Sequence, residues 1–107
     1  MTNFSLQDLE LIIAQRAKSK DVNSYTAKLI QSGERRILQK FGEEATEFLI
    51  AALGTDRQEK IDEAADLIYH LLVVLNVNEI NFSDILSCLE KRRHRSGLDE
   101  KASRNEK

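Results

Sequence analysis

The chain has 107 residues, of which 41% are hydrophobic and 32% charged, so it can form one modest core, and we expect a single domain over residues 1–107. Residues 1–90 hold 9 basic and 15 acidic residues, whereas residues 91–107 hold 7 basic and 3 acidic ones. The acidic body argues against general nucleic-acid binding, and the single cysteine excludes an internal disulfide. No signal peptide or membrane span is visible, so we expect a cytoplasmic protein.

The first helix is predicted to run from Leu6 to about Lys20, because apolar residues recur there at helical spacing. Ser5 is its expected N-cap, with Asp8 at the position that completes a capping box. Residues 21–24 are expected to form a loop. The short segment SYTAKLIQSG, residues 24–33, is expected to be partly helical.

The second and third helices are predicted over residues 34–53 and from about residue 57 to Val77, separated by Gly54. Thr55 or Asp56 is the expected N-cap of the third helix. Its second half, LIYHLLVVL, is apolar on nearly every side, which is more surface than one small protomer covers. We therefore expect a homodimer or a higher homo-oligomer. The buried stripe of the second helix is predicted to consist of Leu38, Phe41, Ala45, Phe48, Leu49 and Ala52.

A fourth helix is predicted from about Asp84 to His94, capped by Ser83, and a basic tail follows at about residues 95–107. The absence of proline and the four glycines favour long helices over a sheet with many tight turns. The predicted fold is an all-α helical bundle of four to five helices with short connections.

Two pairs of carboxylates are predicted to face one another on the second and third helices. Glu44 and Glu47 are three residues apart, and so are Glu63 and Asp66, so each pair shares one face of its helix. The short connection around Gly54 makes the two helices antiparallel neighbours, which brings the pairs together. Four converging carboxylates repel one another unless a cation joins them.

Oxygen-only ligands select hard cations, so the predicted cofactor is Mg²⁺, or alternatively Mn²⁺. Mg²⁺ commonly takes its remaining ligands from phosphate oxygens, which points to a polyphosphate ester as substrate. A solvated acidic face is the plainer alternative. A di-iron bundle would need Glu-x-x-His on two helices, whereas Asp66 and His70, like Glu90 and His94, are four residues apart.

Several segments resemble a known family, the phosphoribosyl-ATP pyrophosphohydrolases of histidine biosynthesis, within the MazG-like superfamily of all-α nucleotide pyrophosphohydrolases. The resemblance covers the chain from about Leu6 to Arg104. It rests on the segments SYTAKL at 24–29, KFGEEATE at 40–47, EAADLIYHLLV at 63–73 and RSGLDEKASR at 95–104.

The resemblance implies an enzyme that hydrolyses phosphoribosyl-ATP between its α and β phosphates, giving phosphoribosyl-AMP and pyrophosphate, in a form without the cyclohydrolase that acts next. It implies that the metal ligands are Glu44, Glu47, Glu63 and Asp66. Glu43 is either a further ligand or orients the attacking water. Two rival functions stay open: a house-cleaning nucleoside triphosphate pyrophosphatase, and a non-catalytic helical dimer.

Further residues are candidate substrate contacts, each with a structural alternative. Lys40 contacts a phosphate or is a solvated helix lysine. Tyr25 and Thr26 meet the ribose or base, although Tyr25 could instead pack against the bundle. His70 supports the acids, carries a proton or is a core histidine. The tail residues expected to bind the substrate's 5′-phosphate, unless this end is frayed, are Arg95, Ser96, Lys101 and Arg104.

Overall fold

The computed structural model describes residues 2–93 and 104. It consists of helices joined by short connections, and no strand occurs in this part of the chain, which confirms the all-α prediction. The helices are α1 (Leu6–Ala17), α2 (Tyr25–Gln31), α3 (Glu34–Leu53), α4 (Arg57–Val77) and α5 (Phe82–Arg92).

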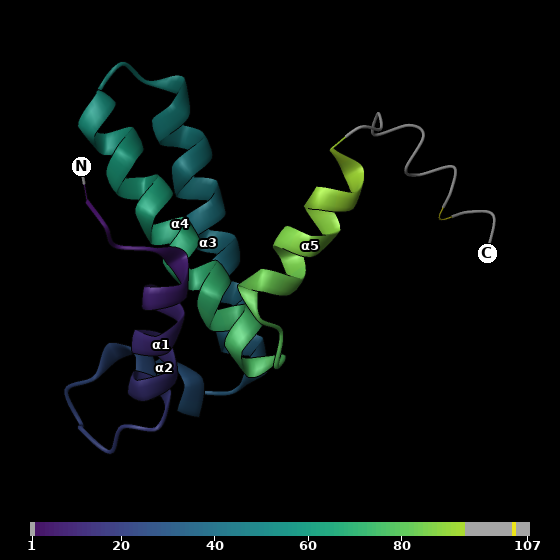
Figure 1. Ribbon diagram of the computed structural model, residues 1–107. Coiled ribbons are helices and arrows are strands. Elements are labelled where there is room, and N and C mark those ends of the chain that lie inside the picture. Colours follow the sequence, from purple (N-terminus) through teal and green to yellow (C-terminus); the bar gives the residue numbers. More distant parts are fainter. Residues whose placement is uncertain (1, 94–103, 105–107) are drawn as a thin grey trace.

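Helices α3 and α4 form a long antiparallel hairpin (Figure 1), whose bounds agree with the sequence prediction. Gly33 precedes α3 with φ 98°, a conformation that glycine adopts without a side-chain clash. Asp56 caps α4 by accepting hydrogen bonds from the backbone N–H groups of Gln58 and Glu59. Because Gly54 ends α3 only three residues before α4 begins, the acidic faces of the two helices meet, as predicted.

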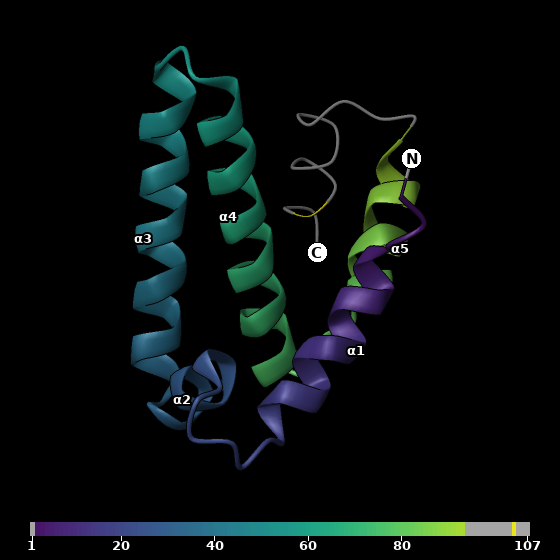
Figure 2. The same cartoon turned by 90° about the vertical axis from the view of Figure 1, so that its left-hand side faces the viewer.

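Helices α1 and α5 form a second arm that meets the hairpin near the C-terminal end of α4, while α2 lies at the base of α3 (Figure 2). The predicted capping box of α1, made by Ser5 and Asp8, is present. The core lies where α1, α2, α3 and the second half of α4 meet. Its buried members are Ile13, Leu29, Ile37, Leu72, Val73 and Leu75.

Three predicted details were wrong. α1 ends at Ala17 instead of near Lys20. α5 begins at Phe82 after the N-cap Asn81, because Asn81 and Asp84 form a capping box two residues before the expected cap at Ser83. The predicted stripe of α3 is largely uncovered in the protomer: Leu38, Leu49 and Ala52 are exposed, whereas Phe41, Ala45 and Phe48 are half-buried.

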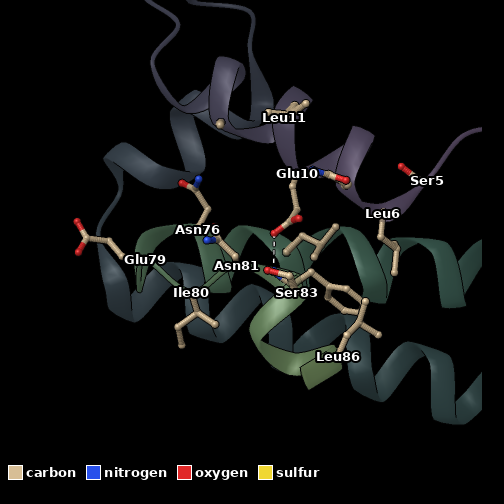
Figure 3. A pocket seen from close by; sticks show the side chains of 14 residues that line it. Ser5, Leu6, Glu10, Leu11, Asn76, Glu79, Ile80, Asn81, Ser83 and Leu86 are labelled. Atoms are coloured by element: carbon tan, nitrogen blue, oxygen red, sulfur yellow. Dashed lines mark hydrogen bonds between the residues drawn. The ribbon is translucent and has the colours of Figure 1, made fainter. Parts of the chain in front are cut away.

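A groove of about 900 Å³ lies between α1, the end of α4 and α5 (Figure 3). Its apolar lining includes Leu6, Leu11, Ile80 and Leu86, and none of the predicted site residues lines it. Glu10 extends from α1 and accepts a hydrogen bond from the backbone N–H of Phe82 at 2.6 Å. In the described ranges, no single helix is long and apolar enough to cross a membrane; only α4 and α5 taken together, with a 105° bend between them, pass that test by length and composition.

Candidate metal centre and active site

Three of the four predicted metal ligands converge between α3 and α4. Glu44 from α3 and Glu63 and Asp66 from α4 each offer a carboxylate oxygen, and these oxygens lie within 4.8 Å of one another. Glu44 is buried and Glu63 is half-buried, whereas Asp66 is exposed. One side of the cluster is therefore enclosed by protein and the other is open to solvent.

The cluster holds more negative charge than the described residues around it compensate. The buried Oε2 atoms of Glu44 and Glu63 have no hydrogen-bond partner among the described residues. Desolvation raises the pKa of Glu63 above its usual 4.5, and the charges of Glu47, Asp66 and Glu44 raise that pKa further. A buried carboxylate oxygen without a donor is costly, and a hard divalent cation would satisfy both atoms. The donor set thus fits Mg²⁺ or Mn²⁺.

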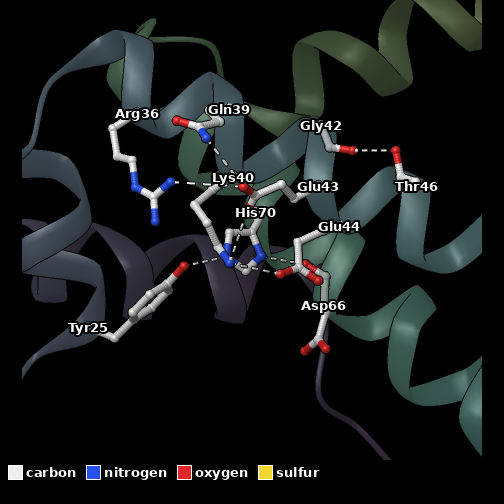
Figure 4. A network of polar contacts seen from close by, with 10 residues as sticks. All are labelled: Tyr25, Arg36, Gln39, Lys40, Gly42, Glu43, Glu44, Thr46, Asp66 and His70. Carbon is white, nitrogen blue, oxygen red and sulfur yellow. Dashed lines mark hydrogen bonds and ion pairs between the residues drawn. The ribbon is translucent and has the colours of Figure 1, made fainter.

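Lys40 lies at the edge of this cluster (Figure 4), with its Nζ 3.4 Å from Glu44 Oε1 and 3.4 Å from Glu43 Oε2. Burial would lower the pKa of Lys40, but Tyr25 and the two glutamates raise it above its usual 10.5. The lysine is therefore cationic at neutral pH. It occupies one oxygen of Glu44 and leaves the other, Oε2, for a different partner.

Buried His70 connects the cluster to α2. Its Nδ1 lies 2.7 Å from the backbone carbonyl oxygen of Asp66, and its Nε2 lies 2.8 Å from the hydroxyl of Tyr25. A carbonyl only accepts, so Nδ1 carries the proton. In the neutral ring Nε2 is then an acceptor, and the Tyr25 hydroxyl donates to it. His70 thereby holds the half-exposed Tyr25 beside the acidic cluster.

Comparisons with known proteins identify the family of the chain. The family model for phosphoribosyl-ATP pyrophosphohydrolase matches residues 6–93. The chain belongs to this family. Relatives named phosphoribosyl-ATP pyrophosphatase occur in Sinorhizobium medicae, Rhizobium meliloti and Agrobacterium fabrum, with 51%, 50% and 51% identity over 104 residues. Each alignment covers 97% of this chain and 97% of the relative.

Some predicted site residues lie elsewhere than in the three-carboxylate cluster. Glu43 contacts residues of α3 instead of the other carboxylates. Besides Lys40, its Oε1 lies 4.0 Å from Arg36 Nη1 and 3.4 Å from Gln39 Nε2. Glu47 is exposed and adjoins Glu63, whose pKa it raises both through its charge and through a side-chain hydrogen bond. Of the predicted tail residues, Arg95, Ser96 and Lys101 lie outside the described residues, whereas Arg104 is described and exposed.

A second hydrogen-bond network, next to the first, was not predicted from the sequence. Thr26 is buried, and its hydroxyl contacts the hydroxyl of Tyr69, the neighbour of His70 on α4. Arg16 Nη1 on α1 donates to the same Tyr69 hydroxyl at 2.9 Å. The structure therefore buries Thr26 against Tyr69. Only the packing of α1 and α2 on α4 brings these residues together, so no local pattern could have indicated the network.

Proposed function

We propose that this protein hydrolyses phosphoribosyl-ATP to phosphoribosyl-AMP and pyrophosphate, an early step of histidine biosynthesis, in the cytoplasm. The main support for this proposal is the carboxylate cluster of Glu44, Glu63 and Asp66. It lies in a chain with 51% and 50% sequence identity to enzymes named for this substrate. The unpartnered Oε2 atoms of Glu44 and Glu63 support a metal-dependent reaction over a merely solvated acidic face.

In this proposal Glu44, Glu63 and Asp66 hold Mg²⁺, or alternatively Mn²⁺, and Glu47 completes the set. A bound Mg²⁺ supplies charge neutralisation for the phosphates and lowers the pKa of a coordinated water. Lys40 orients Glu44 through Oε1 and offers its ammonium to a phosphate oxygen. In the same proposal Glu43, held by Lys40, either completes the metal ligands or orients the attacking water.

Tyr25 and His70 form the wall of the site on the α2 side. Tyr25 is half-exposed and presents its ring towards the ribose or base, while His70 is buried behind it. His70 uses both ring nitrogens for protein contacts, which favours a positioning role over proton transfer. The 5′-phosphate contacts expected from Arg95, Ser96, Lys101 and Arg104 stay a prediction.

We propose a homo-oligomer whose interface differs from the LIYHLLVVL segment that the sequence indicated. Leu72, Val73 and Leu75 in the LIYHLLVVL segment are buried within the protomer, and Ile68 is 42% exposed, so most of this segment does not require a partner. The hairpin does offer an apolar surface, because Leu49 is 63% exposed and Leu53 is 89% exposed. Apolar side chains grouped in this way commonly mark a protein interface. We infer a homodimer that covers this face of α3 and α4.

Pyrophosphate release from phosphoribosyl-ATP and from a panel of nucleoside triphosphates, with and without Mg²⁺, tests the proposal. Activity should require Mg²⁺ and should strongly favour phosphoribosyl-ATP. Glu63→Gln and Asp66→Asn should each abolish turnover with the helical circular dichroism intact. Asp62→Asn is the matched control, since Asp62 lies beside Glu63 on α4 but its carboxylate is exposed and accepts from Gln58.

Each alternative has its own result in this assay. Equal hydrolysis of many nucleoside triphosphates would indicate a house-cleaning pyrophosphatase. Pyrophosphate release from none of the substrates would indicate a non-catalytic helical protein. Wild-type turnover in both Glu63→Gln and Asp66→Asn would exclude the carboxylate cluster as the active site.

A further inference from the structure

We propose that a second, polar pocket beside the carboxylate cluster binds a ribose 5-phosphate group. The pocket has a volume of about 460 Å³ and lies between the end of α1, the connection from α1 to α2, and Tyr69 of α4. Among the described residues that line it, Arg16 is the only basic one and Asp21 the only acidic one. This pairing suits a ligand with both an anionic end and hydroxyl groups.

The Arg16 guanidinium is held in place but largely unused. Nη1 donates to the Tyr69 hydroxyl at 2.9 Å, and the guanidinium carbon lies 6.0 Å from the centre of the Tyr69 ring. The other N–H groups have no partner among the described residues. An anchored guanidinium with free donors is suited to a phosphate, which it can contact through two parallel hydrogen bonds.

Two serines add donors to the same pocket. Ser19 Oγ accepts a hydrogen bond from the backbone N–H of Asp21 at 3.0 Å, and Ser24 Oγ accepts one from that of Ala27 at 3.2 Å. Each hydroxyl proton is therefore left to donate, because neither serine donates to another described residue. With Arg16, the lining has a surplus of donors, which calls for a ligand rich in acceptors such as a phosphate.

Asp21 explains why the ligand would be a sugar phosphate and not a free phosphate. Its Oδ1 accepts from the backbone N–H of Asn23 at 2.9 Å, which leaves Oδ2 without a partner in the described part of the chain. A carboxylate repels a phosphate, but it is a good acceptor for ribose hydroxyls. Asp21 thus favours a sugar phosphate over free phosphate by accepting from the ribose hydroxyls, while Arg16 binds the phosphate.

The pocket adjoins the candidate active site through Tyr25. This residue lines the pocket, while its hydroxyl donates to His70, whose ring contacts the backbone of Asp66. This assignment rests on the proposed function: the group in the pocket is the phosphoribosyl group on the base, remote from the scissile phosphates. Arg16 then makes the 5′-phosphate contact that was expected of the tail residues. That group is what distinguishes phosphoribosyl-ATP from ATP.

Binding of ribose 5-phosphate to the full-length protein without metal, measured by isothermal titration calorimetry, tests the pocket directly. Arg16→Gln should weaken this binding by at least about tenfold, since it removes the charge and the fork of donors. Arg57→Gln is the control, because Arg57 is an exposed arginine at the far end of α4 and should leave binding unchanged. Equal affinity in wild type and Arg16→Gln, or no binding to wild type, would overturn the proposal.

Asp21→Asn is a second variant, and it should change the affinity for phosphate in the opposite direction to Arg16→Gln. It keeps the Oδ1 acceptor for the backbone N–H of Asn23. It should bind inorganic phosphate as well as or better than wild type does, because a negative charge is lost. It should also reduce the preference for ribose 5-phosphate over inorganic phosphate. A fall in affinity for both ligands alike would contradict the role given to Asp21 and this assignment of the ligand.

Kinetics separate this inference from the proposed function. Arg16→Gln should lower the ratio of kcat/KM for phosphoribosyl-ATP to kcat/KM for ATP by at least about tenfold, mainly through KM. An unchanged ratio in an active enzyme would reject the pocket and leave the proposed function standing. Arg16-dependent binding of ribose 5-phosphate without hydrolysis of phosphoribosyl-ATP would support the pocket and reject the proposed function.

Discussion

The Glu63 carboxylate is costly in the metal-free protein, because partial burial and the neighbouring carboxylates disfavour its ionised form. Its pKa is raised above 4.5, so the folded protein binds its proton more tightly than the unfolded chain does. The cost is therefore absent below about pH 4.5 and complete above the raised pKa. We expect Glu63→Gln to increase the melting temperature of the metal-free protein at pH 7, and this gain should vanish as the pH falls towards 4.5.

Thermal denaturation in the presence of chelator measures this effect, with Asp62→Asn as the control of equal charge change. Added Mg²⁺ should reverse the order, because the metal stabilises the wild-type folded state and not the variant. A metal-free Glu63→Gln protein that melts below wild type at pH 7 would show that Glu63 has an unseen stabilising partner.

The contact between Tyr25 and His70 is predicted to be worth about 1 kcal/mol, the usual net value of a neutral hydrogen bond. His70→Asn keeps a nitrogen that can donate to the Asp66 carbonyl but removes the acceptor used by Tyr25, and Tyr25→Phe removes the donor. In a double-mutant cycle on unfolding free energy, the two changes together should cost less than the sum of each alone. Strict additivity would mean that the hydrogen bond contributes nothing to stability.

At the scale of elements, the best predicted helices were those whose ends are set by local chemistry. The cap at Asp56 and the glycines at 33 and 54 fixed the bounds of α3 and α4. The start of α5 was misplaced because Asn81 and Ser83 are both good caps, and Asn81 has the better partner in Asp84. Which side of α3 is buried depends on what packs against it, so periodicity alone could not identify it.

The same contrast holds for the candidate site. Spacing on two helices was enough to predict that Glu44, Glu63 and Asp66 meet, because a short connection leaves few alternatives. The pairing of Tyr25 with His70 spans 45 residues, and the contact of Arg16 with Tyr69 spans 53. These contacts depend on how α1 and α2 pack, which the sequence pattern does not specify.

The exposed side of α3 gives a prediction about assembly. Leu49→Glu places a charge in the apolar face of the hairpin and should dissociate the proposed dimer, since a buried unpaired charge is strongly unfavourable. Light scattering of wild type and variant at micromolar concentration gives the mass directly. Val22→Glu, in the exposed connection between α1 and α2, should not change it. A wild-type mass of 12.2 kDa would contradict the dimer.

At the scale of the whole molecule, the proposed metal site and the core are separate. The buried cluster of Ile13, Leu72, Val73 and their neighbours lies on α1, α2 and the ends of the hairpin helices that pack on them, and it contains no carboxylate. Folding should therefore be driven by this apolar core, and the metal should add stability only by binding the folded state.

Chelation is thus predicted to abolish turnover while the helices persist. Far-ultraviolet circular dichroism after treatment with EDTA should match that of the Mg²⁺-loaded protein, and activity should return when Mg²⁺ is added back. Leu72→Ala is a useful contrast, because truncating a buried leucine typically costs about 2–5 kcal/mol and should lower the melting temperature with or without metal. Loss of helical signal on chelation alone would make the metal structural, as in proteins whose folding depends on their ion. The three carboxylates would then be holding the hairpin together instead of serving only its chemistry.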